Sequence, residues 1–131
     1  MASKATAAGR RVYIAPFDIR LPYRDEADAA VEMVVQPDIA VICDPSKLDE
    51  KGYRGAPDWI IEILFPTTAA KDQIRRRALY ERHGVREYWL VHPTDRVLLM
   101  YRLGTDGYGK PDILPTVGSC TPTAIPDLVI D

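Results

Sequence analysis

Two acidic residues, Asp38 and Glu62, each stand inside an apolar run of the sequence. Residues 59–64 read Trp-Ile-Ile-Glu-Ile-Leu, and residues 34–42 read Val-Val-Gln-Pro-Asp-Ile-Ala-Val-Ile. Burying an ionised carboxylate is costly unless a cation or a hydrogen-bond donor compensates it. We therefore expect both carboxylates to face a cation, a basic side chain or a polar cleft.

A divalent metal would satisfy both acids at once. If the two runs are neighbouring strands of one sheet, both carboxylates can project from the same face. Two convergent carboxylates suit Mg²⁺ or Mn²⁺, which prefer oxygen ligands and keep several waters, and the backbone carbonyl of Ile63 could add a ligand. Simpler interpretations stay open, because Pro37-Asp38 is a common turn pair and Glu62 could form a structural ion pair with an arginine.

The segment after Glu62 predicts a helix. Thr67 or Thr68 can cap a helix that runs to about His83, with Gly84 as its C-terminal stop. The apolar residues of this segment predict its inward stripe: Ala70, Ile74 and Ala78.

This helix places charged residues close to the acidic run. Asp72, Arg76 and Tyr80 share one helix face by their spacing, and Lys71 and Arg75 share the next. Because the helix begins near the end of the Glu62 strand, one of these cations could approach a substrate phosphate. The alternative is an exposed Asp72–Arg76 pair of little energetic value, in a solvated row of arginines.

The remaining elements read mostly as strands. Strand signals cover residues 11–21, 31–44, 85–91, 96–103 and, more weakly, 113–114 and 117–120, while residues 45–57 read as a polar surface loop. This order of strands, one helix and then strands predicts an α/β (α+β) fold, in which a helix packs on a mixed sheet.

Composition limits the class of protein. The chain has 131 residues and a net charge of -2, which predicts a single domain over residues 1–131 with a flexible lead-in at 1–10. Bulk nucleic-acid binding usually needs a basic excess, although a local patch can suffice. No run reaches the ~18–20 apolar residues of a membrane span, so we expect a cytoplasmic protein. Two cysteines without a CxxC motif indicate neither a zinc site nor a disulfide framework.

Three sequence motifs form an ordered series around the helix that contains Tyr80. They are Gln-Pro-Asp-Ile-Ala-Val at residues 36–41, Gly-Ala-Pro-Asp-Trp-Ile-Ile-Glu-Ile at 55–63 and Gly-Val-Arg-Glu-Tyr-Trp-Leu-Val at 84–91. The series resembles the PD-(D/E)XK nuclease superfamily, and more narrowly its restriction-endonuclease branch that is abundant in cyanobacteria and other bacteria. The resemblance runs from about Arg11 to Leu103.

The resemblance implies a restriction-endonuclease-like mixed sheet flanked by helices and Mg²⁺-dependent cleavage of DNA phosphodiesters. It puts Asp38 and Glu62 in the two metal-ligand positions. In this branch the catalytic lysine stands on the helix, four residues before the helix tyrosine, which here is the position of Arg76. The metal would polarise the phosphate and activate water, and the cation would stabilise charge on phosphorus.

Several departures from the branch leave two hypotheses open. Arg76 replaces lysine and cannot act as a base, and Phe65 stands where serine is usual. The branch also leads us to expect a further N-terminal stretch with a helix, which the residues before Arg11 are too few to supply. The first hypothesis is a metal-dependent DNA endonuclease, acting as a symmetric homodimer, with Arg76 or Lys71 as the cation. The second is a catalytically degenerate relative that serves as a binding or assembly module.

Overall fold

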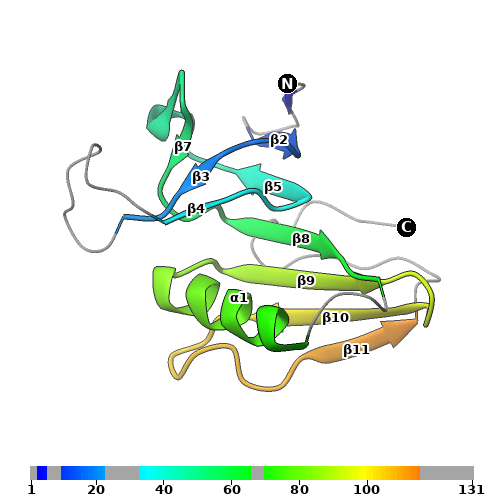
Figure 1. Ribbon diagram of the computed structural model, residues 1–131. Helices are drawn as coiled ribbons and strands as arrows, with labels where there is room; N and C mark the ends of the chain where they lie inside the picture. Colours follow the sequence, from blue (N-terminus) through cyan, green and yellow to red (C-terminus); the bar gives the residue numbers. More distant parts are fainter. Residues whose placement is uncertain (1–2, 6–9, 23–32, 66–69, 116–131) are drawn as a thin grey trace.

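The computed structural model describes residues 3–5, 10–22, 33–65 and 70–115 (Figure 1). Side chains are described for the same residues except 3–5 and 70–72. Seven of the described strands form one main sheet in the order β1-β2-β5-β8-β9-β10-β11. Their bounds are β1 Ser3–Ala5, β2 Arg11–Ile14, β5 Ile39–Ile42, β8 Trp59–Ile63, β9 Glu87–His92, β10 Val97–Arg102 and β11 Asp112–Pro115.

Neighbouring strands of the main sheet are antiparallel except β8 and β9, which run parallel. Parallel neighbours need a crossover connection, and the helix α1, Ala70–His83, supplies it. Gly84 follows α1 with a φ of +83°, a left-handed conformation that glycine adopts without strain. The predicted α+β fold, with a helix after the Glu62 strand and a glycine stop, is confirmed.

A smaller four-stranded sheet lies beside the main one in the order β4-β3-β7-β6. Its strands are β3 Ile19–Arg20, β4 Val34–Val35, β6 Leu48–Asp49 and β7 Gly52–Arg54. The hairpin β6–β7, preceded by a 3-10 helix at Pro45–Lys47, occupies the segment expected to be a polar loop. That expectation was wrong because strands of two or three residues show no readable period, although Tyr53 between them is 1% exposed.

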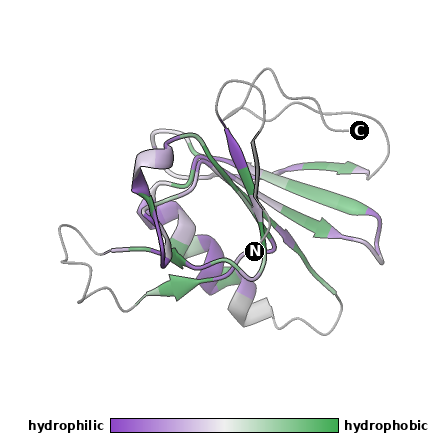
Figure 2. Ribbon diagram, turned by 90° about the horizontal axis from the view of Figure 1, so that it is seen from above, coloured by the Kyte–Doolittle hydropathy of each residue, from purple (hydrophilic) through white to green (hydrophobic). Residues whose placement is uncertain are grey.

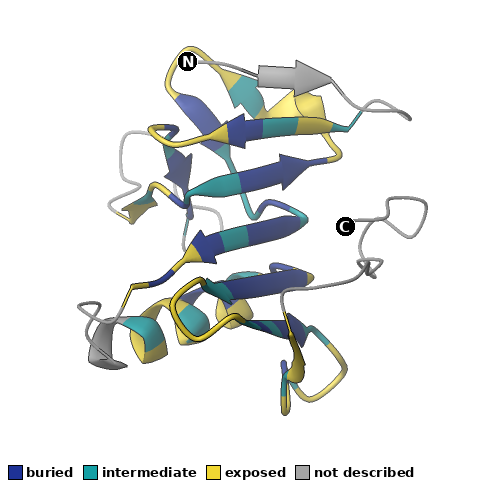
Figure 3. Ribbon diagram, turned by 90° about the vertical axis from the view of Figure 1, so that its right-hand side faces the viewer, coloured by how far each residue is buried: buried dark blue, intermediate teal, exposed yellow. Residues whose placement is uncertain are grey.

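Side chains of β8 alternate between two cores on opposite faces of the main sheet. Ile60 belongs to the larger core together with Tyr80 of α1, whereas Trp59 belongs to a smaller core with Trp89. Because successive side chains of a strand point to opposite faces, Glu62 lies on the α1 side with Ile60. Figures 2 and 3 show the apolar and buried residues concentrated in the strands and hydrophilic residues along α1.

The inward face of α1 differs from the predicted stripe. Ile74 is 56% exposed and Ala78 is exposed, whereas Leu79 and Tyr80 are buried. In this orientation the helix buries Leu79 and Tyr80 and brings the Tyr80 phenol to Glu62, which outweighs the burial of Ile74 and Ala78. The Ala70 side chain lies outside the described residues, as do Thr67, Thr68 and the weak strand signal at residues 117–120.

The N-terminal end also differs from expectation. Residues Ser3–Ala5, expected in a flexible lead-in, form β1 and pair with β2. None of the helices in the described part of the chain has the length and apolar character that crossing a membrane requires.

Replacing Gly52 with alanine tests the contact between β7 and the residues that precede β3. Gly52 has a φ of +118°, and a Cβ there would lie 2.2 Å from the carbonyl oxygen of Asp18. We expect Gly52→Ala to lower the free energy of unfolding by about 3 kcal/mol in urea denaturation, through backbone strain and overpacking together.

Gly84→Ala is the matched control, because Gly84 also has a positive φ but no atom within 4 Å of the added Cβ. It should cost only about 1 kcal/mol, from the left-handed backbone alone. Equal losses in the two variants would contradict the close packing of β7 on Asp18.

Candidate active site

Asp38 and Glu62 come from adjacent antiparallel strands. The register of β5 and β8 pairs Ile39 with Ile61 and Ala40 with Ile60. One further step along this register sets Asp38 across from Glu62. Residues directly opposite in an antiparallel pair share a face of the sheet, and Ala40 and Ile60 are both in the core on the α1 side. Glu62 therefore projects toward α1, and Asp38, which immediately precedes β5, lies across from it at the end of β8.

The carboxylate of Glu62 is buried, with 2% of the residue exposed, and accepts three hydrogen bonds. Its Oε1 accepts from Arg76 Nη1 at 3.0 Å and from the Tyr80 hydroxyl at 2.8 Å. Its Oε2 accepts a longer bond, 3.3 Å, from the Tyr88 hydroxyl. The structural ion pair left open by the sequence is thus present, with Arg76 as the partner.

The local environment keeps the three donors protonated. Burial, followed by the charge of Glu62, raises the pKa values of Tyr80 and Tyr88 far above the usual range. Burial is the largest single influence and acts to lower the pKa of Arg76, but the charge and hydrogen bond of Glu62, together with Tyr80 and Tyr88, raise it overall. The Arg76 side chain keeps 48% of its surface exposed, so its guanidinium reaches from the buried acid to solvent.

Asp38 is half-buried and is held by its backbone and its side chain. Its Oδ2 accepts a hydrogen bond of 2.7 Å from the backbone N–H of Ile63, the residue after Glu62. Its carbonyl oxygen accepts one of 3.0 Å from the N–H of Ala15, which follows β2. The Asp38 side chain is therefore tied to the end of β8, next to Glu62.

The other predicted site residues have different outcomes. Tyr80 is fully buried and donates to Glu62. Lys71 and Asp72 belong to α1, but their side chains lie outside the described residues. Tyr88, which the sequence analysis placed only within the motif at residues 84–91, is a third donor to Glu62. The pairing of Ile60 with Tyr88 in the parallel strands β8 and β9 brings it there, and sequence alone does not show that pairing.

A second buried carboxylate, Glu87, lies on the opposite face of the main sheet. Its Oε2 accepts a hydrogen bond of 2.6 Å from Trp89 Nε1, and its Oε1 lies 4.0 Å from Nε of Arg102. Glu87 and Trp89 alternate on one face of β9, and the Trp89 ring packs edge-on against Trp59 in the smaller core. In the sequence, Glu87 resembles Glu62, because both are acids inside an apolar strand. Only the fold shows that they lie on opposite faces of the main sheet.

The donor set on the α1 side fits a magnesium-type ion. Within the described residues no three His, Cys, Asp or Glu side chains gather, so a cage made only of protein ligands is absent there. Mg²⁺ usually binds one or two carboxylates and keeps waters or substrate phosphates as its other ligands. Asp38 and Glu62 match that pattern, because each carboxylate has an oxygen that a metal could use. Glu62 Oε2 accepts only a long hydrogen bond, and the described hydrogen bonds of the Asp38 carboxylate involve only Oδ2.

Residues 3–131 match the Uma2 family, which is described as "Putative restriction endonuclease". The chain belongs to the Uma2 family. The predicted resemblance to the restriction-endonuclease branch is thereby confirmed. Among curated proteins none matches the chain.

A solved structure has a similar fold. The crystal structure titled as a putative nuclease belonging to DUF820 from Anabaena variabilis ATCC 29413 aligns with a TM-score of 0.66 at 21% sequence identity. The alignment covers 92% of this chain and 64% of that one, so this chain spans about two-thirds of the solved chain's length. This likeness shows a common restriction-endonuclease-like fold.

The unequal hydrogen bonds to Glu62 lead to a prediction for two phenylalanine variants. Tyr80→Phe removes the 2.8 Å bond to Oε1, and Tyr88→Phe removes the 3.3 Å bond to Oε2. Since hydrogen bonds to charged groups contribute about 1.5–3 kcal/mol, we expect Tyr80→Phe to lower the free energy of unfolding by about 2 kcal/mol. Tyr88→Phe should cost about half as much in the same urea titration. A larger loss for Tyr88→Phe would show that the network is arranged differently.

Proposed function

We propose that this Uma2 protein is a metal-dependent DNA endonuclease that hydrolyses phosphodiester bonds at Asp38 and Glu62. Membership of the family supports nuclease chemistry. The observation that carries the proposal is the cross-strand proximity of Asp38, just before β5, and Glu62 on β8, with the Arg76 guanidinium 3.0 Å from Glu62. Acids that share a face beside a cation are suited to a metal and a phosphate together.

Asp38, Glu62 and the Ile63 carbonyl would hold Mg²⁺ or Mn²⁺, which when bound supplies Lewis acidity toward a phosphate and lowers the pKa of a bound water. The protein's own part is to hold these ligands in position. The Ile63 N–H orients the Asp38 carboxylate, and the phenols of Tyr80 and Tyr88 orient that of Glu62. Such supporting hydrogen bonds fix ligand geometry before a substrate binds.

Arg76 has an electrostatic part in the proposed reaction. Its half-exposed guanidinium lies beside Glu62, where it can stabilise negative charge that develops on the phosphate oxygens. It stays protonated and therefore takes no proton from water. In this proposal the proton of the attacking water goes to solvent or to a phosphate oxygen, and the charge of Arg76 stabilises the negative charge on the phosphate.

The second candidate function is a catalytically degenerate nuclease fold that acts as a binding or assembly module. The observation that favours it is the state of Glu62, whose charge is already compensated by Arg76 and two phenols. A metal must then share this carboxylate with a resident cation. DNA as the substrate and a symmetric homodimer belong to the first candidate and remain predictions from the sequence, as does a cytoplasmic location.

A metal titration separates the two candidates. With saturating Mg²⁺ or Mn²⁺ we expect plasmid DNA cleavage and a rise of about 1–3 kcal/mol in the free energy of unfolding. Asp38→Asn keeps an acceptor for the Ile63 N–H and Glu62→Gln keeps one for the Tyr80 hydroxyl, so both should fold. Each should lose the metal-induced stabilisation and reduce cleavage by at least about a hundredfold, the scale of one lost catalytic group.

Asp112→Asn is the matched control, since it makes the same chemical change at an exposed carboxylate of β11 that pairs with Arg102. It should keep both responses. If metal neither stabilises the wild-type protein nor supports cleavage, the proposed enzyme activity fails.

Arg76→Lys tests whether the guanidinium limits the site. The ammonium group of lysine is a compact, strongly hydrated point charge, and we expect it to hold Glu62 less tightly than the guanidinium does and to leave the carboxylate freer for a metal. We expect Arg76→Lys, alone or with Phe65→Ser, to raise the rate of metal-dependent cleavage at least about tenfold, which is ~1.4 kcal/mol in the barrier. The exposed neighbour provides the control, Arg75→Lys, which should cleave like the wild type. If neither Arg76→Lys nor the double variant with Phe65→Ser raises the cleavage rate, the result favours the degenerate module.

A further inference from the structure

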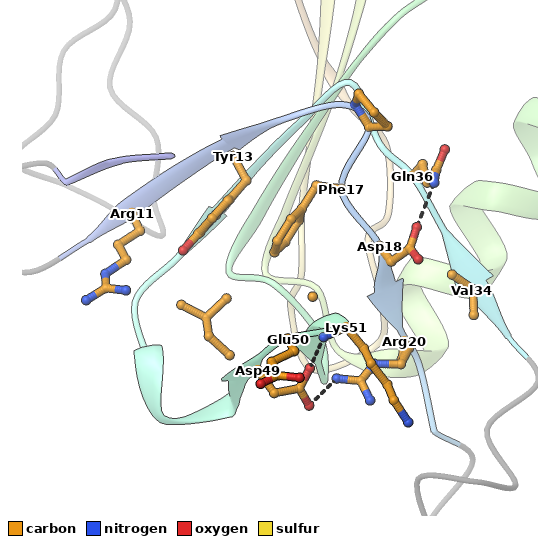
Figure 4. Close-up of a pocket in the computed structure, with 13 residues that line it drawn as sticks. Arg11, Tyr13, Phe17, Asp18, Arg20, Val34, Gln36, Asp49, Glu50 and Lys51 are labelled. Atoms are coloured by element: carbon orange, nitrogen blue, oxygen red, sulfur yellow. Dashed lines mark hydrogen bonds and ion pairs between the residues drawn. The ribbon is translucent and has the colours of Figure 1, made fainter. Parts of the chain in front are cut away.

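A cavity of about 760 Å³ opens between the start of the main sheet and the β6–β7 hairpin (Figure 4). Its walls come from β2, from the segment that leads to β3 and from residues 48–52 of the hairpin. This volume is within the range of small-molecule sites and is large enough for a nucleotide. The sequence analysis did not anticipate it, because it depends on the hairpin that was expected to be a loop.

The cavity lies beside the two carboxylates on the same face of the main sheet. Tyr13 in its wall pairs with Ala40, which pairs with Ile60, and all three belong to the core on the α1 side. Ala40 is two residues from Asp38 along the strand, a rise of about 7 Å. Gln36, another wall residue, precedes Asp38 by two positions in the chain. Through Gln36 and β2, the cavity therefore adjoins the segment that carries Asp38.

One wall of the cavity is aromatic. The rings of Tyr13 and Phe17 are stacked, with centroids 4.1 Å apart and an angle of 12° between their planes. Figure 4 shows these two rings between Arg11 on one side and Asp18 and Gln36 on the other. Only 8% of Tyr13 and 5% of Phe17 is exposed, so the pair forms a rigid, mostly buried wall whose exposed part is what a planar heteroaromatic group would contact.

The other walls carry acceptors and donors in balance. Gln36 Nε2 donates to Asp18 Oδ1 at 2.6 Å, and Arg20 Nη2 donates to Asp49 Oδ2 at 2.5 Å. Three basic residues of the lining, Arg11, Arg20 and Lys51, are matched by three acidic ones, Asp18, Asp49 and Glu50. Carboxylates at this density disfavour a phosphate inside the cavity. Both oxygens of Asp49 already accept, from Arg20 and from the Lys51 N–H, so Asp18 and exposed Glu50 are the carboxylates that would accept from the ring and amino N–H groups of a nucleobase.

We propose that this cavity receives a nucleobase of the DNA strand whose phosphate lies at Asp38 and Glu62. The inference rests on the proposed function and adds a recognition site for an unstacked base. An unpaired or extruded base would pack against the Tyr13–Phe17 wall and donate to the carboxylate side, while exposed Arg11 at the rim faces the strand's phosphates. Enzymes that read unstacked bases combine these two kinds of contact.

Binding of single strands in EDTA tests the cavity without cleavage. The probes are a short fluorescent oligodeoxyadenylate and the same backbone with abasic sites throughout. We expect the oligodeoxyadenylate to bind at least about tenfold more tightly, the scale of one stacked base. Val34→Trp places an indole at the partly exposed Val34 in the cavity wall and should abolish this preference.

Ile113→Trp, at an exposed position on β11, is the matched control and should keep the preference. The proposal is overturned if neither strand binds, if both bind equally, or if the preference survives in Val34→Trp. Because these measurements contain no divalent metal, their failure counts against the cavity alone. Absence of cleavage in the metal titration counts against the proposed chemistry alone.

Discussion

The buried carboxylate of Glu62 is the constraint on which the proposed site depends. An ion at 2% exposure must be matched by charge or by donors, and here one guanidinium and two phenols share that task. These donors come from α1 and β9, so the helix and the following strand must both dock correctly before the acid is compensated. The fold and the site are therefore stabilised by the same interactions.

The β8–α1–β9 unit explains how a short chain achieves this. Parallel pairing of β8 and β9 requires a crossover, and α1 makes that crossover on the face that carries Glu62. Arg76 and Tyr80 lie one turn apart on α1, so one helix face supplies two donors to the same oxygen. Glu87 faces the other way and serves the tryptophan core, which leaves the α1 side to the proposed chemistry.

Arg76 is relevant to both candidate functions, the active nuclease and the degenerate module. Its charge compensates Glu62 when no other cation is near, and the same charge can support a phosphate at the site. Stability and activity would then compete for one carboxylate, as often happens where a catalytic group is buried. The cavity between β2 and the β6–β7 hairpin adds a feature that does not depend on this competition, because neither Arg76 nor Glu62 lines it.

The sequence by itself determined the features that are local. The strand around Glu62, the end of α1 at Gly84 and the β9–β10 hairpin follow from apolar runs and turn residues a few positions apart. Membership of the nuclease family followed from an ordered series of such motifs. Only the tertiary structure decided which face of α1 is buried, that Tyr88 donates to Glu62, and that residues 48–54 form a hairpin beside a cavity. These outcomes depend on which distant surfaces bury most area and satisfy a buried charge together, and no local period encodes that choice.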